Sequence, residues 1–427
     1  MRHLGWFDIF RLGLVQAGIG AIVVLTTSTL NRIMVVELAL PASLSGALVA
    51  LYYLVQLTRP NWGWRSDAGG ARSPWILGGV AALALGGLLA TFGVMLLPRS
   101  LAGGLAVSIA AYVVIGAGVS AAGTSLLALL GTSTHPDRRA AAATITWLMM
   151  IAGIALTAAG VGRALEPYSP ARLLWIVTAL GAGVTLLTAL AIWGIERRLE
   201  PASGPARAQG FRAAMAEVWA DPRARLFAIF VFLSMVAYFM QELILEPFAG
   251  HVFGFTPGQS TTLAGLQNGG VFAGMLTVGG VASGLRIGSL RLWTAGGCLG
   301  SAAALAAVAG VGLSGPGAPL LPAVFALGYF NGVFAVAAIG SMMQLAGEGG
   351  GGQEGARMGL WGAAQAIAAG FGGFLGAASV DAMRLVLPRE ADAYGAVFLA
   401  EAALFLLAAG LALRAVASPL ARPVPGQ

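Results

Sequence analysis

Twelve long uncharged stretches constrain this chain more than any other feature of its sequence. Of 427 residues, 58% are apolar and 10% are charged, whereas about a quarter of the residues in a soluble domain are charged. Each stretch approaches the roughly 20 residues that cross the hydrocarbon core of a bilayer. Because backbone amides in lipid must be satisfied within their own segment, we expect helices. The sequence predicts an all-α membrane protein with twelve transmembrane helices, at residues 12–30, 43–58, 74–97, 103–130, 141–162, 173–195, 226–247, 260–284, 292–313, 319–346, 358–380 and 394–416.

The basic residues indicate how the chain is oriented. All 24 are arginine, and with the N-terminus inside, 18 of them fall on the cytoplasmic side. Cytoplasmic loops of membrane proteins are enriched in basic residues, so both termini are expected in the cytoplasm. The net charge of +7 is interpreted as this topology and as contact with anionic lipid headgroups, not as nucleic-acid binding. Without lysine, the chain has neither a P-loop lysine nor a Schiff-base lysine.

The longest polar segment divides the chain into two halves. Residues 196–225 are rich in glycine, proline and charge, which is typical of a loop. Six predicted spans lie on each side of this segment. We expect an N-terminal half at 1–195, a cytoplasmic linker at 196–225, and a C-terminal half at 226–427 that ends in a short cytoplasmic tail. Two pseudo-symmetric six-helix halves with a site between them near the bilayer midplane are one plan of transporter folds.

A short charged loop between the second and third spans carries a recognisable spacing. Residues 63–72 place Gly63, Asp67, Gly70 and Arg72 at relative positions one, five, eight and ten. This loop resembles the corresponding loop of major facilitator superfamily transporters, although Ala71 replaces a usual basic residue. The resemblance implies a conformational latch of charge contacts at the cytoplasmic ends of helices, to which Arg138 and Arg139 also belong. The second copy, at residues 279–288, keeps its glycines and Arg286 but lacks an acid.

Further runs along the whole chain are similar to one family. They are densest near the N-terminus and comprise residues 11–16, 26–32, 35–41, 59–63, 66–67, 72–76 and 361–376. These runs resemble the PucC family, a branch of the major facilitators found in photosynthetic bacteria. The resemblance implies handling of bacteriochlorophyll, or assistance to antenna polypeptides, in a bacterial inner or intracytoplasmic photosynthetic membrane.

Polar residues inside spans are expensive in lipid and are candidates for function. Asn31, Arg32 and Glu37 lie near the outer end of span one; Arg32 and Glu37 are interpreted either as a structural ion pair or as ligand or partner contacts. Gln56 lies near the inner end of span two, where it either caps and anchors that end with Arg59 or contacts a ligand.

Glu242 and Glu246 lie four residues apart, on one face of span seven. They are either a solvated mouth or a proton or cation site. Gln267 and Asn268 in span eight, and Asn331 in span ten, either form interhelical hydrogen bonds or line a central cavity. Glu401 is a lone carboxylate in span twelve that is expected to face protein.

Glycines and the single cysteine are interpreted as packing residues. Cys298 in span nine has no partner cysteine in the chain, so an intramolecular disulfide is not possible. Glycines four residues apart suit close helix contacts, and such pairs occur at Gly270 and Gly274, Gly296 and Gly300, and Gly372 and Gly376.

A bacteriochlorin requires an axial ligand for its magnesium, and imidazole is the simplest. The only histidines are His3, His135 and His251, all expected at or beyond the membrane surfaces. We therefore predict no metal site and no tightly bound cofactor, with bacteriochlorophyll as a cargo. Trp62, Trp64 and Trp75 are expected at the inner interface, where aromatic belts form.

Three functions compete. The first is an assembly factor that receives bacteriochlorophyll, a precursor or light-harvesting antenna polypeptides, with homo-oligomers as a further possibility. The second is a secondary transporter of a pigment, precursor or other small molecule. The third, prenyl transfer, requires aspartate-rich motifs that bind magnesium and diphosphate. Glu242 and Glu246 resemble these only distantly, so we expect no enzyme.

Overall fold

The computed structural model describes residues 3–59, 62, 71–135, 138–196, 219–220, 222–284, 287–315, 317–348 and 354–415, with backbone alone at 139–140, 282–284, 343–348 and 354–363. This part of the chain is helical and contains no β-strand. Its twelve α-helices are α1 (Trp6–Val24), α2 (Ala42–Gln56), α4 (Ser73–Leu96), α5 (Leu101–Ser133), α6 (Arg139–Ala164), α7 (Pro170–Ile192), α9 (Pro222–Phe253), α10 (Pro257–Val278), α11 (Leu290–Ser314), α12 (Leu320–Glu348), α13 (Glu354–Arg384) and α14 (Glu390–Ala415).

These helices correspond one to one with the twelve predicted spans, and the predicted fold class is confirmed. Ten helical stretches of the described chain are long and apolar enough to cross a membrane by composition alone. The other two spans are α2 and α10. The first has only 15 residues, and the second carries Gln267, Asn268 and several hydroxyl side chains, which lower its hydropathy.

The first span is longer than predicted. After Val24 the helix continues through two π-helical segments, η1 (Leu25–Leu30) and η2 (Ile33–Glu37), so that Asn31 and Arg32 lie within it. A π-helical turn is wider than an α-helical turn and often occurs at functional sites. Here the Tyr112 hydroxyl of α5 donates a hydrogen bond to the carbonyl oxygen of Thr26 at 3.0 Å. A third π-helical segment, η5 (Gly279–Gly284), extends α10.

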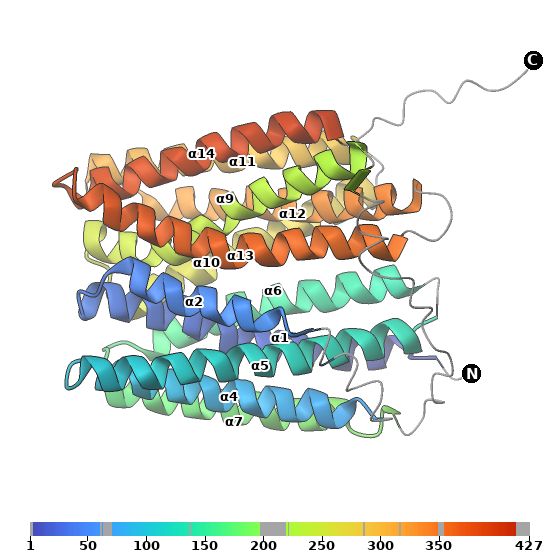
Figure 1. Cartoon of the computed structure of the whole chain (residues 1–427), viewed down its shortest axis with the longest axis horizontal. Coiled ribbons are helices and arrows are strands. Elements are labelled where there is room, and N and C mark those ends of the chain that lie inside the picture. Colours follow the sequence, from blue (N-terminus) through green and yellow to red (C-terminus); the bar gives the residue numbers. More distant parts are fainter. Residues whose placement is uncertain are drawn as a thin grey trace, which may run out of the picture.

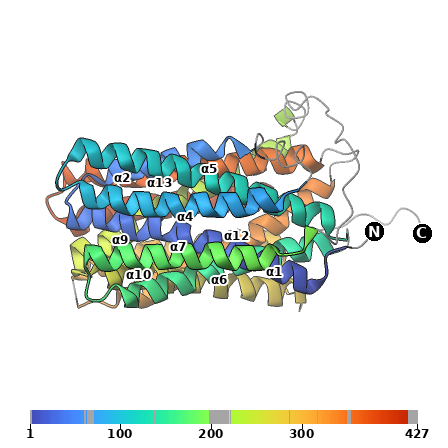
Figure 2. The same cartoon turned by 90° about the horizontal axis from the view of Figure 1, so that it is seen from below.

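The helices form two bundles that lie side by side (Figure 1). The buried apolar side chains form one core from α1 to α7 and a second core from α9 to α14. The halves meet along two helix pairs, α2 with α13 and α6 with α10, which lie on opposite sides of the bundle (Figure 2). This arrangement leaves α1 and α9 between the two seams, where polar side chains of both halves meet.

The two ends of the bundle are distinguished here by the helix ends that they contain. The terminal end is the one at which α1 begins and α14 ends (Figure 1). The far end is the opposite one, with the connections that join α1 to α2, α9 to α10, and α13 to α14. Because each half has an even number of helices, both halves begin and finish at the terminal end.

Glycines allow several of these helices to pack closely, as expected in membranes. A Cβ at Gly270 or Gly274 would collide with the backbone of α12, and one at Gly372 or Gly376 would collide with the backbone of α9. Gly300 lies against the Phe330 ring, whereas Gly296 faces open space. Two of the three predicted pairs therefore mediate helix contacts at both positions. Cys298 is buried in the C-terminal core, as predicted.

Candidate functional site between the two halves

Arg32 is the buried cation of the far end. Its side chain is 2% exposed, and it forms the predicted ion pair with Glu37, which is 39% exposed. A second guanidinium nitrogen donates to the carbonyl oxygen of Phe255, just beyond α9. A charge inside a span requires such partners. Arg32 therefore stabilises the end of span one and joins the two halves.

Two neighbouring side chains on span one also bond across the halves. The Asn31 amide donates to the carbonyl oxygen of Leu243 in α9 at 2.7 Å, and the hydroxyl oxygens of Thr29 and Thr261 lie 3.1 Å apart. Both interactions lie closer to the bundle centre than Arg32 along span one. One face of span one, at Thr29, Asn31 and Arg32, therefore contacts the C-terminal half.

Asp381 provides a contact that the sequence did not single out. Its carboxylate accepts hydrogen bonds from the backbone amides of Ala42, at 3.1 Å, and Ser43, at 2.7 Å. These are the first two amides of α2, which have no partner within their own helix. A carboxylate at a helix N-terminus is also favoured by the helix dipole. An acid of the C-terminal half thus caps a helix of the N-terminal half. The only sequence feature that could have indicated this role is the position of Asp381 directly after predicted span eleven.

Asp381 belongs to a larger polar network centred on Arg384. Arg384 lies 3.4 Å from Asp381 and 2.9 Å from Glu390, and it donates to the Tyr394 hydroxyl at 3.1 Å. Another hydrogen bond of 3.1 Å joins Arg384 to Nδ1 of His251. Because arginine can only donate, this Nδ1 acts as acceptor. His251 is therefore part of a network among α9, α13 and α14.

A further contact joins the halves at the α6–α10 seam. Glu166, just beyond α6, accepts a hydrogen bond from the Thr256 hydroxyl at the start of α10. Gly162 and Gly258 pack backbone to backbone beside it. Carboxylates of both halves thus hold the far end at both seams.

Glu242 and Glu246 differ in their surroundings. The interpretation of a solvated mouth is wrong for Glu246, which is 3% exposed. It was placed near a surface because span seven was expected to end at Pro247, whereas α9 continues to Phe253. Glu242 is half-buried and lies close enough to Tyr53 and Tyr238 to act on both electrostatically.

The other predicted polar residues do not come together in one site. Asn331 accepts a hydrogen bond from Ser301 at 2.8 Å, between α12 and α11, so the interhelical interpretation holds for it. Asn268 donates to Ala264 of its own helix, and Gln267 is half-buried beside it. Glu401 is 0% exposed and faces protein as expected. Gln56 accepts a hydrogen bond from Arg59 at the end of α2, as the anchoring interpretation requires.

Part of the predicted latch lies outside the described residues, namely Gly63, Asp67 and Gly70. The same is true of Arg286, Trp64 and the side chain of Arg139. Arg72 is described: its guanidinium donates to the Thr132 hydroxyl at 2.6 Å, and its backbone amide donates to Glu196 at 2.6 Å. Arg138 lies 5.3 Å from the centre of the Trp6 ring. The conformational role of these residues stays a prediction.

Glu196 caps α4 at the terminal end. Its carboxylate accepts from the amides of Arg72 and, at 2.8 Å, Ser73. Glu196 is the first residue of the predicted linker and lies four residues beyond α7, so this contact joins no helix of the C-terminal half. The aromatic residues expected near this end lie close together, since the rings of Trp62 and Trp75 are 5.9 Å apart.

The histidines do not converge on one site. The rings of His3 and His135 are 5.1 Å apart at the terminal end, whereas His251 is at the far end. In the described part of the chain, no three His, Cys, Asp or Glu side chains are grouped as metal ligands would be.

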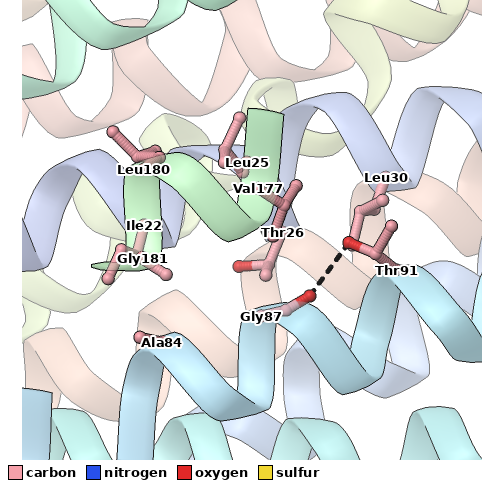
Figure 3. A pocket seen from close by; sticks show the side chains of 10 residues that line it. All are labelled: Ile22, Leu25, Thr26, Leu30, Ala84, Gly87, Thr91, Val177, Leu180 and Gly181. Carbon is pink, nitrogen blue, oxygen red and sulfur yellow. Dashed lines mark hydrogen bonds between the residues drawn. The ribbon is translucent and has the colours of Figure 1, made fainter. Parts of the chain in front are cut away.

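Two hollows lie away from the seam between the halves. Figure 3 shows a small apolar pocket enclosed by span one, α4 and α7, in which the hydroxyls of Thr26 and Thr91 are already bonded to backbone carbonyls. A wider groove of about 390 Å³ runs between α11 and α12. Aromatic and small residues line it, namely Gly288, Leu292, Trp293, Gly296, Tyr329, Phe330 and Val333.

The fold defines a class, the multi-pass membrane proteins with the major facilitator fold. A crystal structure of a bacterial homologue of the human lysosomal transporter Spinster, in an inward-facing and unoccupied conformation, has a TM-score of 0.68 at 15% identity; the match covers 97% of this chain and all of that one. Within this class, the PUCC protein family matches residues 29–420. The chain belongs to the PucC family.

Two relatives from Rhodobacter capsulatus match nearly the whole chain. One is named bacteriochlorophyll synthase 44.5 kDa chain and is 62% identical over 99% of this chain and 98% of its own length. The other is named protein PucC and is 28% identical over 95% of this chain and 91% of its own length. The predicted family is therefore confirmed.

Proposed function

We propose that this chain is an integral-membrane assembly factor for bacterial light-harvesting complexes. It handles bacteriochlorophyll, antenna polypeptides or both on a major facilitator scaffold. The observation that carries the proposal is the family match over residues 29–420, to which the 62% identity with a relative named after bacteriochlorophyll adds support. The arginine distribution supports cytoplasmic termini, and we place the chain in the inner membrane because its spans are helical.

Deletion of the gene tests this proposal. We expect antenna absorption to fall while extracted bacteriochlorophyll continues to be made, because assembly and not synthesis is interrupted. Re-expression of the wild-type chain should restore the antenna. Unchanged antenna absorption in the deletion strain, with normal pigment synthesis, would contradict the proposal.

The groove between α11 and α12 is our candidate for the pigment-docking surface. Its aromatic walls match the apolar, planar character of a tetrapyrrole, and the indole nitrogen of Trp293 is fixed by a 2.9 Å hydrogen bond to the carbonyl oxygen of Ile287. A Gly296→Trp substitution would fill the groove, since a side chain at Gly296 meets no neighbour. We expect it to lower the absorbance of co-purified pigment severalfold. Gly310→Trp is the matched control, because Gly310 also faces open space on the same helix.

A secondary transporter is the second candidate, favoured by the similarity of fold over 97% of the chain. Flux of a pigment precursor in proteoliposomes that collapses in an Asp67→Asn variant would support it. Loss of antenna assembly in cells without any flux in vesicles would exclude it.

We also propose that the chain is not an enzyme. Prenyl transfer needs metal-bound diphosphate held by acidic motifs, and Glu242 with Glu246 is the nearest approach to one in this sequence. Esterification of chlorophyllide by the purified chain alone would overturn this proposal.

A further inference from the structure

The interior of the far end contains a carboxyl group that the contacts above do not use. Glu246 lies on α9, and neither of its carboxylate oxygens has a hydrogen-bond partner among the described residues. Burying an ionised carboxylate without a partner costs far more than burying the neutral acid. The arrangement of the described residues therefore suits a protonated Glu246.

The Arg32 guanidinium has a donor that its contacts with the described residues leave without a partner. Nε of Arg32 is buried and has no partner in the described part of the chain. A Cβ placed at Gly250 would lie 3.2 Å from Nη2 of Arg32. Gly250 follows Glu246 by four residues, so both lie on the same face of α9. The guanidinium thus lies against the face of α9 that carries Glu246, although its ion pair is made with Glu37.

We propose that Glu246 is a proton-binding site and that Arg32 exchanges Glu37 for Glu246 when the proton leaves. With the proton bound, Glu246 is neutral and Arg32 pairs with Glu37, as in the structure. Without it, the buried carboxylate must recruit the guanidinium, because an unpaired buried charge is strongly destabilising. Glu37 is 39% exposed and loses its partner at lower cost in contact with water.

The exchange acts on the contact between the halves. Arg32 also donates to the carbonyl oxygen of Phe255 in the C-terminal half, and a guanidinium that turns toward Glu246 changes this bond. The segment that carries Arg32 lies between two π-helical stretches, where an altered helical register is most easily accommodated. A proton is then a ligand that changes how the halves meet at the far end. This site does not depend on which cargo the protein handles.

Other titratable groups face the same region. Glu242 precedes Glu246 by one turn of α9, and His251 follows it, bonded to Arg384 and Tyr394. Tyr168, between α6 and α7, is near enough to sense Arg32 and Glu37: burial raises its pKa, Glu37 raises it further and Arg32 lowers it. The more distant acids are Asp381 and Glu390 near Arg384, and Glu401 on α14.

Infrared spectroscopy of the full chain in lipid vesicles tests the proposal. We expect a protonated carboxyl band that disappears as the pH is raised and that is absent in Glu246→Gln, an isosteric change that should leave the neutral state folded. Glu401→Gln is the control for another buried acid and should keep the Glu246 band. No loss of any carboxyl band in Glu246→Gln would overturn the proposal.

A second variant tests the exchange of partners. In Glu37→Gln, Arg32 loses its exposed partner and is available to Glu246, so the Glu246 band should disappear at lower pH than in the parent. An unchanged titration in Glu37→Gln would show that Glu246 is protonated by burial alone and would refute the exchange.

Discussion

Asp381 and Glu196 perform the same chemistry at opposite ends of the molecule. Each carboxylate accepts hydrogen bonds from the first backbone amides of another helix, Asp381 on α2 and Glu196 at the start of α4. The two differ in what they join. Asp381 belongs to the C-terminal half and caps a helix of the N-terminal half, whereas Glu196 directly follows the N-terminal half and caps a helix of that half. One device can therefore hold two halves together or only stabilise one of them.

The comparison distinguishes contacts that stabilise one half from contacts that attach the two halves to each other. Asp381 at one seam and Glu166 at the other hold the far end, with Arg32 between them. At the terminal end, Glu196 and Arg72 bond within the N-terminal half. We expect substitutions of the first group to let the far end open and substitutions of the second group to leave its closure unchanged. A cysteine at Val35, which is buried with Ala42 and Ala377 at the α2–α13 seam, can report this opening through its labelling rate.

The largest effect is expected from a wedge at the α6–α10 seam. Gly258→Leu places a side chain where a Cβ already collides with Gly162 and Glu166, and overpacking of this kind costs about 1–3 kcal/mol. Labelling of a cysteine at Val35 should rise and the thermal midpoint of the purified protein should fall. Gly269→Leu is the control on the same helix, because its Cβ meets open space; a similar loss there would show that the effect is not specific to the seam.

Asp381→Asn should have the next largest effect. It removes the charge from two hydrogen bonds at a helix N-terminus and from the contact with Arg384, at a cost of about 1–2 kcal/mol. We expect a severalfold rise in the labelling of a cysteine at Val35. If labelling stayed at the parent rate while the protein remained folded, Asp381 would not be a contact that holds the far end closed.

Glu196→Gln should produce a smaller effect of a different kind. The same capping chemistry is weakened, by about 0.5–1 kcal/mol, but only within the N-terminal half. The thermal midpoint should fall by about one degree, with labelling at Val35 unchanged. Increased labelling would mean that the caps at the two ends are coupled through the bundle.

The smallest effect is expected from Thr29→Val. The lost hydrogen bond to Thr261 is worth about 0.6 kcal/mol, as for other bonds between membrane helices, and should raise labelling by no more than about threefold. Thr91→Val removes a hydroxyl that bonds only within its own helix and should not change labelling at all. Equal effects of the two variants would show that Thr29 does not contribute to the contact between the halves.

Hydrophobicity alone was enough to predict twelve helical spans, because each span must satisfy its backbone internally and must be long enough to cross lipid. The contacts at the far end were harder to predict. The partners of Asp381 and Glu196 are backbone amides, which no sequence pattern reveals. The sequence predicts Arg32 near the end of span one, but the helix continues to Glu37, and the Arg32 guanidinium bonds to Glu37 and to the carbonyl oxygen of Phe255.

The position of Glu246 was also difficult to predict from the sequence. A carboxylate close to a proline suggests the end of a span, yet α9 continues past Pro247 for six residues, since neighbouring groups in a bundle can tolerate the missing amide. Asn331 and Gln56 were easier to interpret, because their partners lie on adjacent helices or within the same turn.

The rate of maleimide labelling at Val35→Cys tests the central claim most directly, in a Cys298→Ala background that removes the native cysteine. Three proteins are compared: this parent, the parent with Asp381→Asn, and the parent with Glu196→Gln. The carboxylate that crosses between the halves should control access to the buried seam. We therefore predict a severalfold faster reaction in Asp381→Asn alone. Equal rates in the three proteins, or a faster reaction in Glu196→Gln, would contradict the claim that Asp381 holds the two halves together at the far end.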